Sequence, residues 1–366
     1  MNMPRLIQCI DQLAPERIAR AKVAFTARRF NLRESVVLLD HDYHPQAGDL
    51  LLATIKKVGH HQSLELQDGR KAHLFVGDEV LVSYGNRYAP DQFEAVVPDT
   101  LDPCHLVAAG GVAARVLSKH SRMEDPSELT PIGVLADIHG RPLNLADFAL
   151  KKLKTKPPLA LTLAVVGSAM NAGKTTTAAY LIKGLTAAGL SVGAAKVTGT
   201  GAGGDVWFMG DAGANPVLDF TDAGFASTYR VPMEQVTEIV AILTSHLNGA
   251  RVDVIVVEIS DGVYQQETAG LLSSPGFAAL VDGIIFAASD AMGAYAGMLC
   301  LEKHGLPILG LSGVLTSSPL AVREAQEATG LPVLTKRTLR DPAISSLLRE
   351  RLASRQAICS VHLRAV

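Results

Sequence analysis

A short stretch of this sequence holds residues of the types that bind phosphate. Residues 167–176 read GSAMNAGKTT and end in a Gly-Lys-Thr-Thr run. A lysine ammonium can pair with the outer phosphates of a nucleotide, and the hydroxyl that follows it can bind Mg²⁺. The usual spacing places a glycine five residues before Gly173, but Ser168 stands there and Gly167 comes one place too early. Because serine is small, we expect a loop of altered shape that still binds phosphate.

The residues on either side of this stretch predict the elements that such a loop needs. A phosphate site requires a strand that enters a tight turn and a helix whose N-terminus faces the anion. Residues 159–166, LALTLAVV, predict a buried strand, and residues 174–185, KTTTAAYLIKGL, predict an amphipathic helix. Lys174 would reach the outer phosphates, and Thr175 would place its hydroxyl on Mg²⁺. The predicted nucleotide contacts in the loop are Gly167, Ser168, Ala169, Met170, Asn171, Ala172, Gly173, Lys174, Thr175 and Thr176.

Two alternatives to this interpretation stay open. An ordinary strand-turn-helix can contain Gly-Lys-Thr by chance, and a degenerate loop can bind phosphate without supporting hydrolysis. The strand and helix on either side favour a true phosphate loop.

Two further polar residues stand at the ends of apolar runs. Lys196 ends SVGAAK and Glu258 ends VIVVE. Ligands of open parallel sheets gather at the carboxyl ends of the strands, so these residues should converge with the loop. A lysine is rarely buried unpaired, so we expect Lys196 to face an anion, with a lysine at the rim of the site as the alternative. Glu258 would hold Mg²⁺ or polarise an attacking group, or else cap the next turn. The predicted catalytic residues are Lys174, Lys196 and Glu258.

A second carboxylate is expected from residues 203–224, which contain four aspartates: Asp205, Asp211, Asp219 and Asp222. The preceding run TGTGAGGD, residues 198–205, could bind a substrate carboxylate or phosphate through its backbone, or form a plain mobile loop. Trp207 could cover the substrate, but anchoring of this loop to the core is the favoured role. The residues alone do not select one aspartate.

The C-terminal part of the chain alternates continuous apolar strands with helical segments. This alternation over residues 159–366 is typical of an α/β protein with a mostly parallel, doubly wound sheet that carries the phosphate loop. Residues 1–125 instead predict a leading helix over 1–30 and then closely spaced strands, typical of a small mainly-β barrel or sandwich. Residues 63–76 form a candidate hairpin. Residues 126–158 predict a connector that ends in the basic linker KKLKTKPP, and within it residues 131–150 could hold one short strand and a helix.

With these residues in place, the chain resembles the dethiobiotin synthetase and cobyrinic acid amide synthase group of P-loop proteins over about residues 160–340. The resemblance rests on the loop, on the Lys-Val-Thr-Gly turn at 196–199 and on the acidic strand end at Glu258. It implies ATP and Mg²⁺ as cofactors, with Thr316 near the base and no guanine-specific signature. It also implies a metal set of Thr175, Asp211 and Glu258, with Asp205 as the nearest rival of Asp211. The turn at 260–262, SDG, departs from the glycine-rich turn of the group.

The resemblance implies an ATP-dependent ligase, synthetase or small-molecule kinase that phosphorylates a carboxylate, carbamate or hydroxyl. A nucleotide switch acting on a protein partner is the first alternative. The second is an acyltransferase, because TGTG, DFTDAG and VVEISDG resemble, more weakly, a P-loop family that contains D-glutamate N-acetyltransferases.

Composition limits the other classes of function. A net charge of −2 gives no overall basic field for nucleic acid. Four separated cysteines fit a reducing cytoplasm, and no apolar run predicts a signal peptide or a membrane span. We therefore expect a cytoplasmic protein that binds a small molecule, not nucleic acid or membrane, with a homodimer left open. The run DHDYH, residues 40–44, is a weaker metal candidate whose favoured interpretation is a charged turn.

Overall fold

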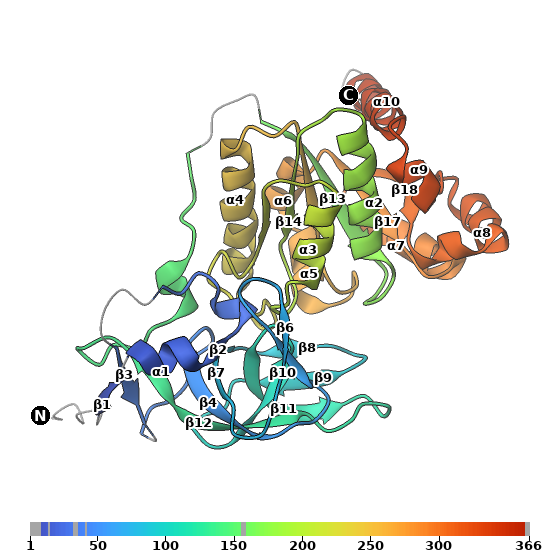
Figure 1. Ribbon diagram of the computed structural model, residues 1–366. Helices are drawn as coiled ribbons and strands as arrows, with labels where there is room; N and C mark the ends of the chain where they lie inside the picture. The colour runs from blue at the N-terminus through green and yellow to red at the C-terminus, as the bar shows by residue number, and fades with distance from the viewer. Residues whose placement is uncertain (1–8, 14, 32–35, 41, 155–158, 363–366) are drawn as a thin grey trace, which may run out of the picture. The chain divides into compact units, whose positions relative to one another are not determined.

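The computed structural model of this chain describes residues 9–13, 15–31, 36–40, 42–154 and 159–362 (Figure 1). The chain divides into two compact units, and each is described by itself. The first unit comprises Met1–Lys151, Gly199–Gly204 and Phe220–Val231, and the second comprises Lys152–Thr198, Asp205–Asp219 and Pro232–Val366. The chain therefore passes between the units five times. Within the described ranges, no helix is both long enough and apolar enough to cross a membrane.

The first unit is built mainly from short strands. Its elements are β1 (Cys9–Leu13), α1 (Pro15–Arg20), β2 (Lys22–Val23), η1 (Phe25–Ala27), β3 (Val36–Leu39), β4 (Leu50–Lys57), β5 (Ser63–Glu65), β6 (Lys71–His73), β7 (Glu79–Tyr84), β8 (Arg87–Tyr88), β9 (Phe93–Val96), β10 (Cys104–Ala108), β11 (Val112–Lys119), β12 (Ser127–Ala136) and η2 (Leu145–Phe148). Strands β12, β4, β7, β11 and β10 pair in that order, and β10 pairs with β12 again, which closes a ring. The predicted barrel-like architecture is therefore present.

Strand β4 shows how the first unit buries both faces of this sheet. Leu50 and Leu52 belong to one apolar cluster, whereas Leu51 and Ile55 belong to another. Successive side chains of a strand point to opposite faces, so one cluster fills the ring and the other packs outside it. The outer cluster includes Ile18 of α1 and residues around η1 and η2. The short helical segments therefore cover the outer face of the ring.

The structure corrects two predictions for the N-terminal half. The helix predicted over residues 1–30 is limited to Pro15–Arg20 among the described residues, because β1, β2 and η1 occupy neighbouring positions. The predicted connector over 126–158 contains β12, a ten-residue strand that pairs with β3, β4 and β10. The first unit consequently continues past residue 125 to Lys151. The predicted hairpin is confirmed, with Ser63 paired with His73.

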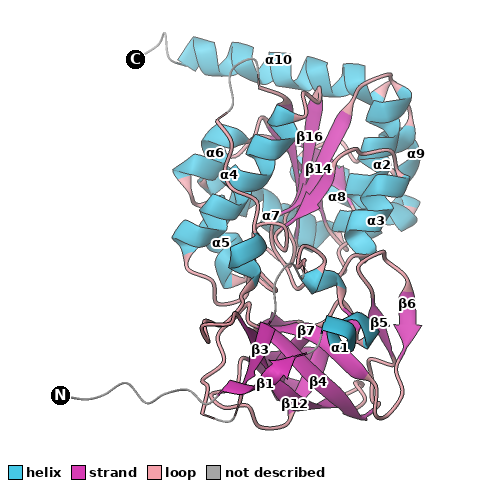
Figure 2. Ribbon diagram, turned by 60° about the vertical axis from the view of Figure 1, so that its left-hand side comes forward, coloured by secondary structure: helices cyan, strands magenta, loops and turns pink. Residues whose placement is uncertain are grey.

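The second unit is a parallel α/β sheet. Its elements are β13 (Leu161–Gly167), α2 (Lys174–Ala187), β14 (Val192–Lys196), α3 (Gly204–Asp211), β15 (Val217–Asp219), α4 (Met233–Gly249), β16 (Val254–Glu258), α5 (Gln266–Leu272), α6 (Pro275–Leu280), β17 (Gly283–Ala287), α7 (Ala291–Lys303), β18 (Ile308–Ser312), η3 (Val314–Ser317), α8 (Pro319–Thr329), α9 (Lys336–Arg340) and α10 (Ile344–His362). The strand order is β15-β14-β16-β13-β17-β18, and all neighbouring pairs are parallel. Helices α2 and α4 lie on opposite faces of this sheet (Figure 2). The predicted doubly wound sheet is therefore present.

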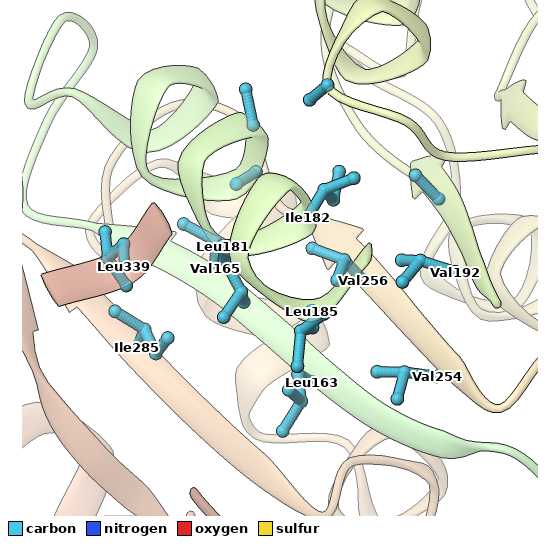
Figure 3. Packing of buried hydrophobic residues seen from close by; sticks show 14 of the residues in the cluster. Leu163, Val165, Leu181, Ile182, Leu185, Val192, Val254, Val256, Ile285 and Leu339 are labelled. Atoms are coloured by element: carbon cyan, nitrogen blue, oxygen red, sulfur yellow. The ribbon is translucent and has the colours of Figure 1, made fainter. Parts of the chain in front are cut away.

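The core of the second unit fixes the strand and the helix that flank the phosphate-loop sequence. Leu163 of β13 packs with Ile182 and Leu185 of α2, and Val256 of β16 completes the contact (Figure 3). All four side chains are at most 2% exposed. Burial of a side chain of this size stabilises a fold by about 1.5–3 kcal/mol. The loop therefore joins two elements whose positions are set by the same core.

Candidate functional site

The segment between β13 and α2 is held at the carboxyl ends of the strands by backbone hydrogen bonds. The Ser168 amide donates to the Ala287 carbonyl at 2.9 Å, which ties the loop to the end of β17. The Val314 amide donates to the Ala172 carbonyl at 3.0 Å, and the Val263 amide donates to the Gly167 carbonyl at 3.2 Å. Three neighbouring chain segments thus hold the two ends of the loop. The structure places the predicted loop where ligands of parallel sheets bind.

Glycines allow this loop to adopt its shape. Gly173, the residue before α2, has φ +95°, and no side chain caps the first turn of the helix. The uncapped N–H groups of a first helical turn form a favourable anion site. Gly313 has φ +96°, and a Cβ atom there would lie 2.3 Å from the Ala172 carbonyl oxygen. Both glycines are therefore required by the close packing of the loop against the end of β18.

Lys174 lies folded over this loop. Its side chain is buried, with the residue 6% exposed, and its ammonium donates to the Ala169 carbonyl at 2.7 Å. A Cβ atom on Gly167 would lie 2.8 Å from Lys174 Cγ, so the glycine makes room for the lysine stem. Burial lowers the pKa of Lys174, against the opposing effect of the Glu258 carboxylate. An anion beside the loop would give this ammonium a charged partner in place of a carbonyl.

Lys196 and Glu258 are direct neighbours across strands β14 and β16. The Lys196 ammonium forms an ion pair with Asp205, the second residue of α3. Glu258 is 1% exposed, and its Oε1 accepts a hydrogen bond from the Thr175 hydroxyl at 2.8 Å. Within the part of the chain that the structure describes, Glu258 Oε2 is buried and has no hydrogen-bond partner. Lys196 and Glu258 therefore lie at adjoining strand ends, close to Lys174 at the start of α2.

The charges of this cluster are strongly coupled. Burial, together with the nearby Asp205 carboxylate, raises the pKa of Glu258 to about 7, although Lys196 and Thr175 oppose the rise. Burial alone would lower the pKa of Lys196, but the Asp205 and Glu258 carboxylates outweigh burial and raise it. Burial alone would raise the pKa of Asp205, but the Lys196 ammonium keeps it below its usual value. Lys196 and Asp205 therefore form a charged pair, and Glu258 is the group that can gain or lose a proton near neutral pH.

The four candidate aspartates lie in different places. Asp205 belongs to the cluster, and Asp219 is buried at the end of β15, in register with Lys196. Asp211 is exposed at the opposite end of α3, about 9 Å along the helix from Asp205. Asp222 forms ion pairs with arginines of the first unit. The structure therefore puts Asp205, not the predicted Asp211, beside the loop. Distance along the sequence cannot show which end of a helix faces a strand end.

The donor atoms of this cluster fit Mg²⁺. This ion prefers oxygen ligands and is usually held by one or two carboxylates together with phosphate oxygens and water. The Thr175 hydroxyl and the unpartnered oxygen of Glu258 supply such atoms, and Asp205 lies close by. Among the residues described, no three His, Cys, Asp or Glu side chains gather as a metal cluster. Of the DHDYH run, His41 lies outside the described residues, and His44 Nδ1 is 2.7 Å from the Asp99 carbonyl oxygen.

Thr316 lies beside a small cavity next to the loop. The cavity has a volume of about 80 Å³. It is lined by Gly173, Thr176, Thr177, Ser312, Gly313, Val314, Thr316, Ser317, Lys336 and Leu339. This volume is well below the roughly 300–1,000 Å³ of whole small-molecule sites, so the cavity suits one part of a ligand, such as the edge of a base. The predicted base-contacting position therefore adjoins the loop.

Sequence reasoning missed several residues that shape this site. Lys336 lines the cavity from α9, a helix that carries no recognisable motif. Gly262 packs against the loop so closely that a Cβ atom would lie 2.5 Å from the Ser168 carbonyl oxygen. The turn at 260–262 departs from the pattern of the resembled group, but nothing in the sequence signals its contact with the loop.

Comparisons with known proteins found distant structural similarities only. A scan against protein-family models found no match, and a search of curated proteins found none either. Among solved structures, the signal recognition particle 54 kDa protein from Aeropyrum pernix K1, in complex with GDP, is 19% identical with a TM-score of 0.38. The match covers 55% of this chain and 51% of that one, so it spans about half the length of that protein.

Two further solved structures are similar to this chain at the same level. The septum site-determining protein MinD from Pyrococcus horikoshii OT3, complexed with Mg-ADP, is 19% identical with a TM-score of 0.34, over 53% of this chain and 86% of that one. A DUF1611 family protein from Anabaena variabilis is 15% identical with a TM-score of 0.36, over 55% of this chain and 62% of that one. TM-scores of this size do not extend the activities of those proteins to this chain. By its own strand order, loop and helix, the second unit is an α/β P-loop sheet.

Proposed function

We propose that the second unit binds ATP with Mg²⁺ and transfers the γ-phosphoryl group to a small-molecule acceptor. The main support is the contact between Thr175 and Glu258, which leaves a buried, unpartnered carboxylate oxygen beside an uncapped helix N-terminus. Burying a polar oxygen without a partner costs about 1–3 kcal/mol, and burying a charged one costs more. A bound cation would provide the partner that the fold does not.

Each residue of the cluster has a distinct role in this proposal. Phosphoryl transfer depends mainly on positioning and on neutralising the charge of the transferred group. Lys174 would move from the Ala169 carbonyl to the β- and γ-phosphate oxygens, and Lys196 would face the acceptor side. Thr175 and Glu258 would hold Mg²⁺, which when bound neutralises charge on those oxygens. Asp205 keeps Lys196 charged and in position.

The acceptor is proposed to be a small carboxylate, carbamate or hydroxyl compound. An acceptor oxygen attacks the γ-phosphorus, the bond to the bridging oxygen breaks, and ADP leaves. A carboxylate becomes an acyl phosphate without losing a proton, whereas a hydroxyl must give up a proton. A group other than Glu258 must accept that proton, because the Glu258 carboxylate holds Mg²⁺ in this proposal. The pH dependence of turnover therefore separates the two kinds of acceptor.

ATP is proposed over GTP because the chain lacks a guanine-specific Asn-Lys-x-Asp signature near Thr316. The first test measures ADP or GDP release with Mg²⁺, alone and with panels of carboxylic acids, amino acids and hydroxyl compounds. Strong stimulation by one small molecule supports the proposal. Release that rises only with a protein fraction would indicate a nucleotide switch, and acetyl-CoA consumption without ADP release would indicate an acyltransferase.

Two substitutions test the assigned roles. Lys174→Ala should weaken ATP binding by about tenfold or more, because a charge-assisted contact to phosphate is lost. Glu258→Gln should lower turnover by about a hundredfold or more while changing ATP affinity much less. Glu267→Gln is the matched control, since Glu267 is also a buried carboxyl of the second unit, 3% exposed, in α5. If Lys174→Ala leaves binding and turnover intact, the phosphate-loop assignment is wrong.

A further inference from the structure

A second candidate site lies wholly within the first unit. It is a cavity of about 630 Å³, a volume within the range of small-molecule sites. Its lining residues are Arg28, Arg29, Asn31, Gln67, Phe148 and Asp222. They come from segments far apart in the sequence that the first unit brings together. The nucleotide proposal makes no use of this cavity.

The two arginines are held side by side by one buried carboxylate. Arg28 Nη2 donates to Asp222 Oδ2 at 2.6 Å, and Arg29 Nη1 donates to Asp222 Oδ1 at 3.2 Å. The Asp222 side chain is 5% exposed. Without this carboxylate the two guanidinium groups would repel each other. Asp222 therefore organises the pair and neutralises one of its two charges, which leaves the cavity wall with a net charge of +1.

The segments that carry these residues are fixed by packing. Arg28 follows η1, and its guanidinium stacks 4.1 Å from the ring centroid of Phe25, which is fully buried. Asp222 lies in a turn that approaches η2 closely, because a Cβ atom on Gly224 would lie 2.8 Å from Ala146 Cα. The Leu150 amide also donates to the Asp222 carbonyl at 2.8 Å. The charged wall is therefore pre-organised, which lowers the entropic cost of binding.

Arg29 is the residue of this wall that has donors left for a ligand. Its Nε donates to the Phe148 carbonyl at 3.1 Å and its Nη1 donates to Asp222, which leaves Nη2 without a partner among the described residues. Its side chain is 36% exposed, whereas that of Arg28 is 15% exposed. The amides of Asn31 and Gln67 and the ring of Phe148 line the same cavity. These groups provide one charged contact, further polar contacts and one apolar surface.

We propose that this cavity binds a small organic acid whose carboxylate pairs with Arg29. A guanidinium is the side chain best suited to a planar carboxylate, because it presents parallel N–H donors. A single net positive charge matches one carboxylate better than a doubly charged phosphate. The Asn31 and Gln67 amides contact polar groups on the rest of the ligand, and Phe148 packs against its carbon chain.

The test uses the full-length chain with Lys174→Ala, so that the phosphate loop does not contribute to the signal. Binding of the monocarboxylates succinamate, butyrate and lactate is measured by calorimetry, beside uncharged succinamide and inorganic phosphate. We expect at least one carboxylate to bind with a Kd of about 1 mM or lower, and succinamide not to bind. Absence of carboxylate binding at ten times that concentration, or tighter binding of phosphate, would overturn the proposal.

Substitutions then locate the site. Arg29→Gln should weaken binding about tenfold or more. Arg29→Lys should weaken it less, because lysine keeps the positive charge and loses only the parallel N–H donors of the guanidinium. Arg115→Gln is the matched control, since Arg115 is exposed in the same unit and does not line the cavity. Unchanged thermal unfolding without ligand shows that Arg29→Gln still folds. Equal loss of binding in Arg29→Gln and Arg115→Gln, or no loss in either, would refute this site. Either result leaves the nucleotide proposal untouched, because nucleotide binding is measured separately.

Discussion

At the scale of single residues, Glu258 is unusual because the fold uses only one of its two carboxylate oxygens. Oε1 accepts a hydrogen bond from Thr175, while Oε2 is buried without a partner in the described part of the chain. Buried polar atoms in native proteins nearly always have partners, so an unpartnered oxygen points to a ligand. Burial also raises the pKa of this carboxyl to about 7. Glu258 therefore serves the site at some cost to stability.

This cost should depend on pH. The pKa of Glu258 is about 7 in the folded chain, against an ordinary value of 4.5, so the folded state binds the proton more tightly. The carboxyl therefore destabilises the fold fully above about pH 7, and the penalty fades as pH falls toward 4.5. Glu258→Gln should raise the free energy of unfolding by about 1–3 kcal/mol at pH 8, and by much less at pH 5. Urea titrations without ligand measure this, and a gain that is the same at both pH values would contradict it.

At the scale of elements, the loop keeps its shape because two turns pack closely against it. Gly262 and Gly313 bring the turns after β16 and β18 so close that no side chain fits between them and the loop. Gly173 supplies the left-handed conformation at the start of α2. These glycines lie far apart in sequence. The phosphate loop is thus shaped by its neighbours as much as by its own residues.

Gly262→Ala should disturb the loop without touching its sequence. The added Cβ atom would lie 2.5 Å from the Ser168 carbonyl oxygen, so the loop or the turn must shift. Overpacking of this kind costs about 1–3 kcal/mol, which corresponds to roughly a tenfold or greater loss of ATP affinity. Gly210→Ala is the control, since a Cβ atom there meets nothing within 4 Å. Fluorescence titration with a labelled ATP analogue compares the two, and equal affinities would show that the turn does not support the loop.

The sequence allowed the elements of the second unit to be predicted because each strand is a continuous apolar run followed by a turn. The positions of Lys174 and Thr175 at the start of α2 could also be predicted, since strand, loop and helix are consecutive in the sequence. The choice between Asp205 and Asp211 was not local, because it depends on which end of α3 approaches Lys196. Of β12, only one short strand within residues 131–150 was predicted, because Thr130 and Pro131 interrupt its apolar pattern and its pairing with β4, β3 and β10 comes from distant parts of the chain.

At the scale of the whole molecule, each unit has its own core, and the proposed nucleotide site depends on the core of the second unit. Ile182 is fully buried in that core, about two turns along α2 from the loop. The buried middle of α2 thus holds in place the helix whose first residue is Lys174. Stability of the second unit and occupation of its site should therefore be linked.

This linkage can be measured with one core variant. Ile182→Ala should lower the free energy of unfolding by about 2–5 kcal/mol, because it leaves a cavity in a fully buried cluster. Mg-ATP at 100 times its Kd should raise the free energy of unfolding of this variant by about 2.7 kcal/mol, since a ligand that binds only the folded state stabilises it by mass action. Chemical denaturation with and without ligand tests this. In the double variant with Lys174→Ala, whose ATP affinity should be about tenfold or more lower, the same ATP concentration should restore about 1.4 kcal/mol or less. Full recovery there would mean that ATP binds elsewhere.

Because the chain passes between the units five times, the first unit is not encoded by one continuous part of the gene. The first unit is completed by six residues, 199–204, and twelve residues, 220–231, that are encoded within the second half of the gene. The Gly203 amide of the first of these segments donates to the buried Glu65, and Ala226 of the second belongs to an apolar cluster of the first unit. A gene break or a protease cut at residue 151 would therefore separate the first unit from part of its own structure. We therefore expect that neither half of the gene encodes a complete folding unit, so recombination should exchange the two halves together.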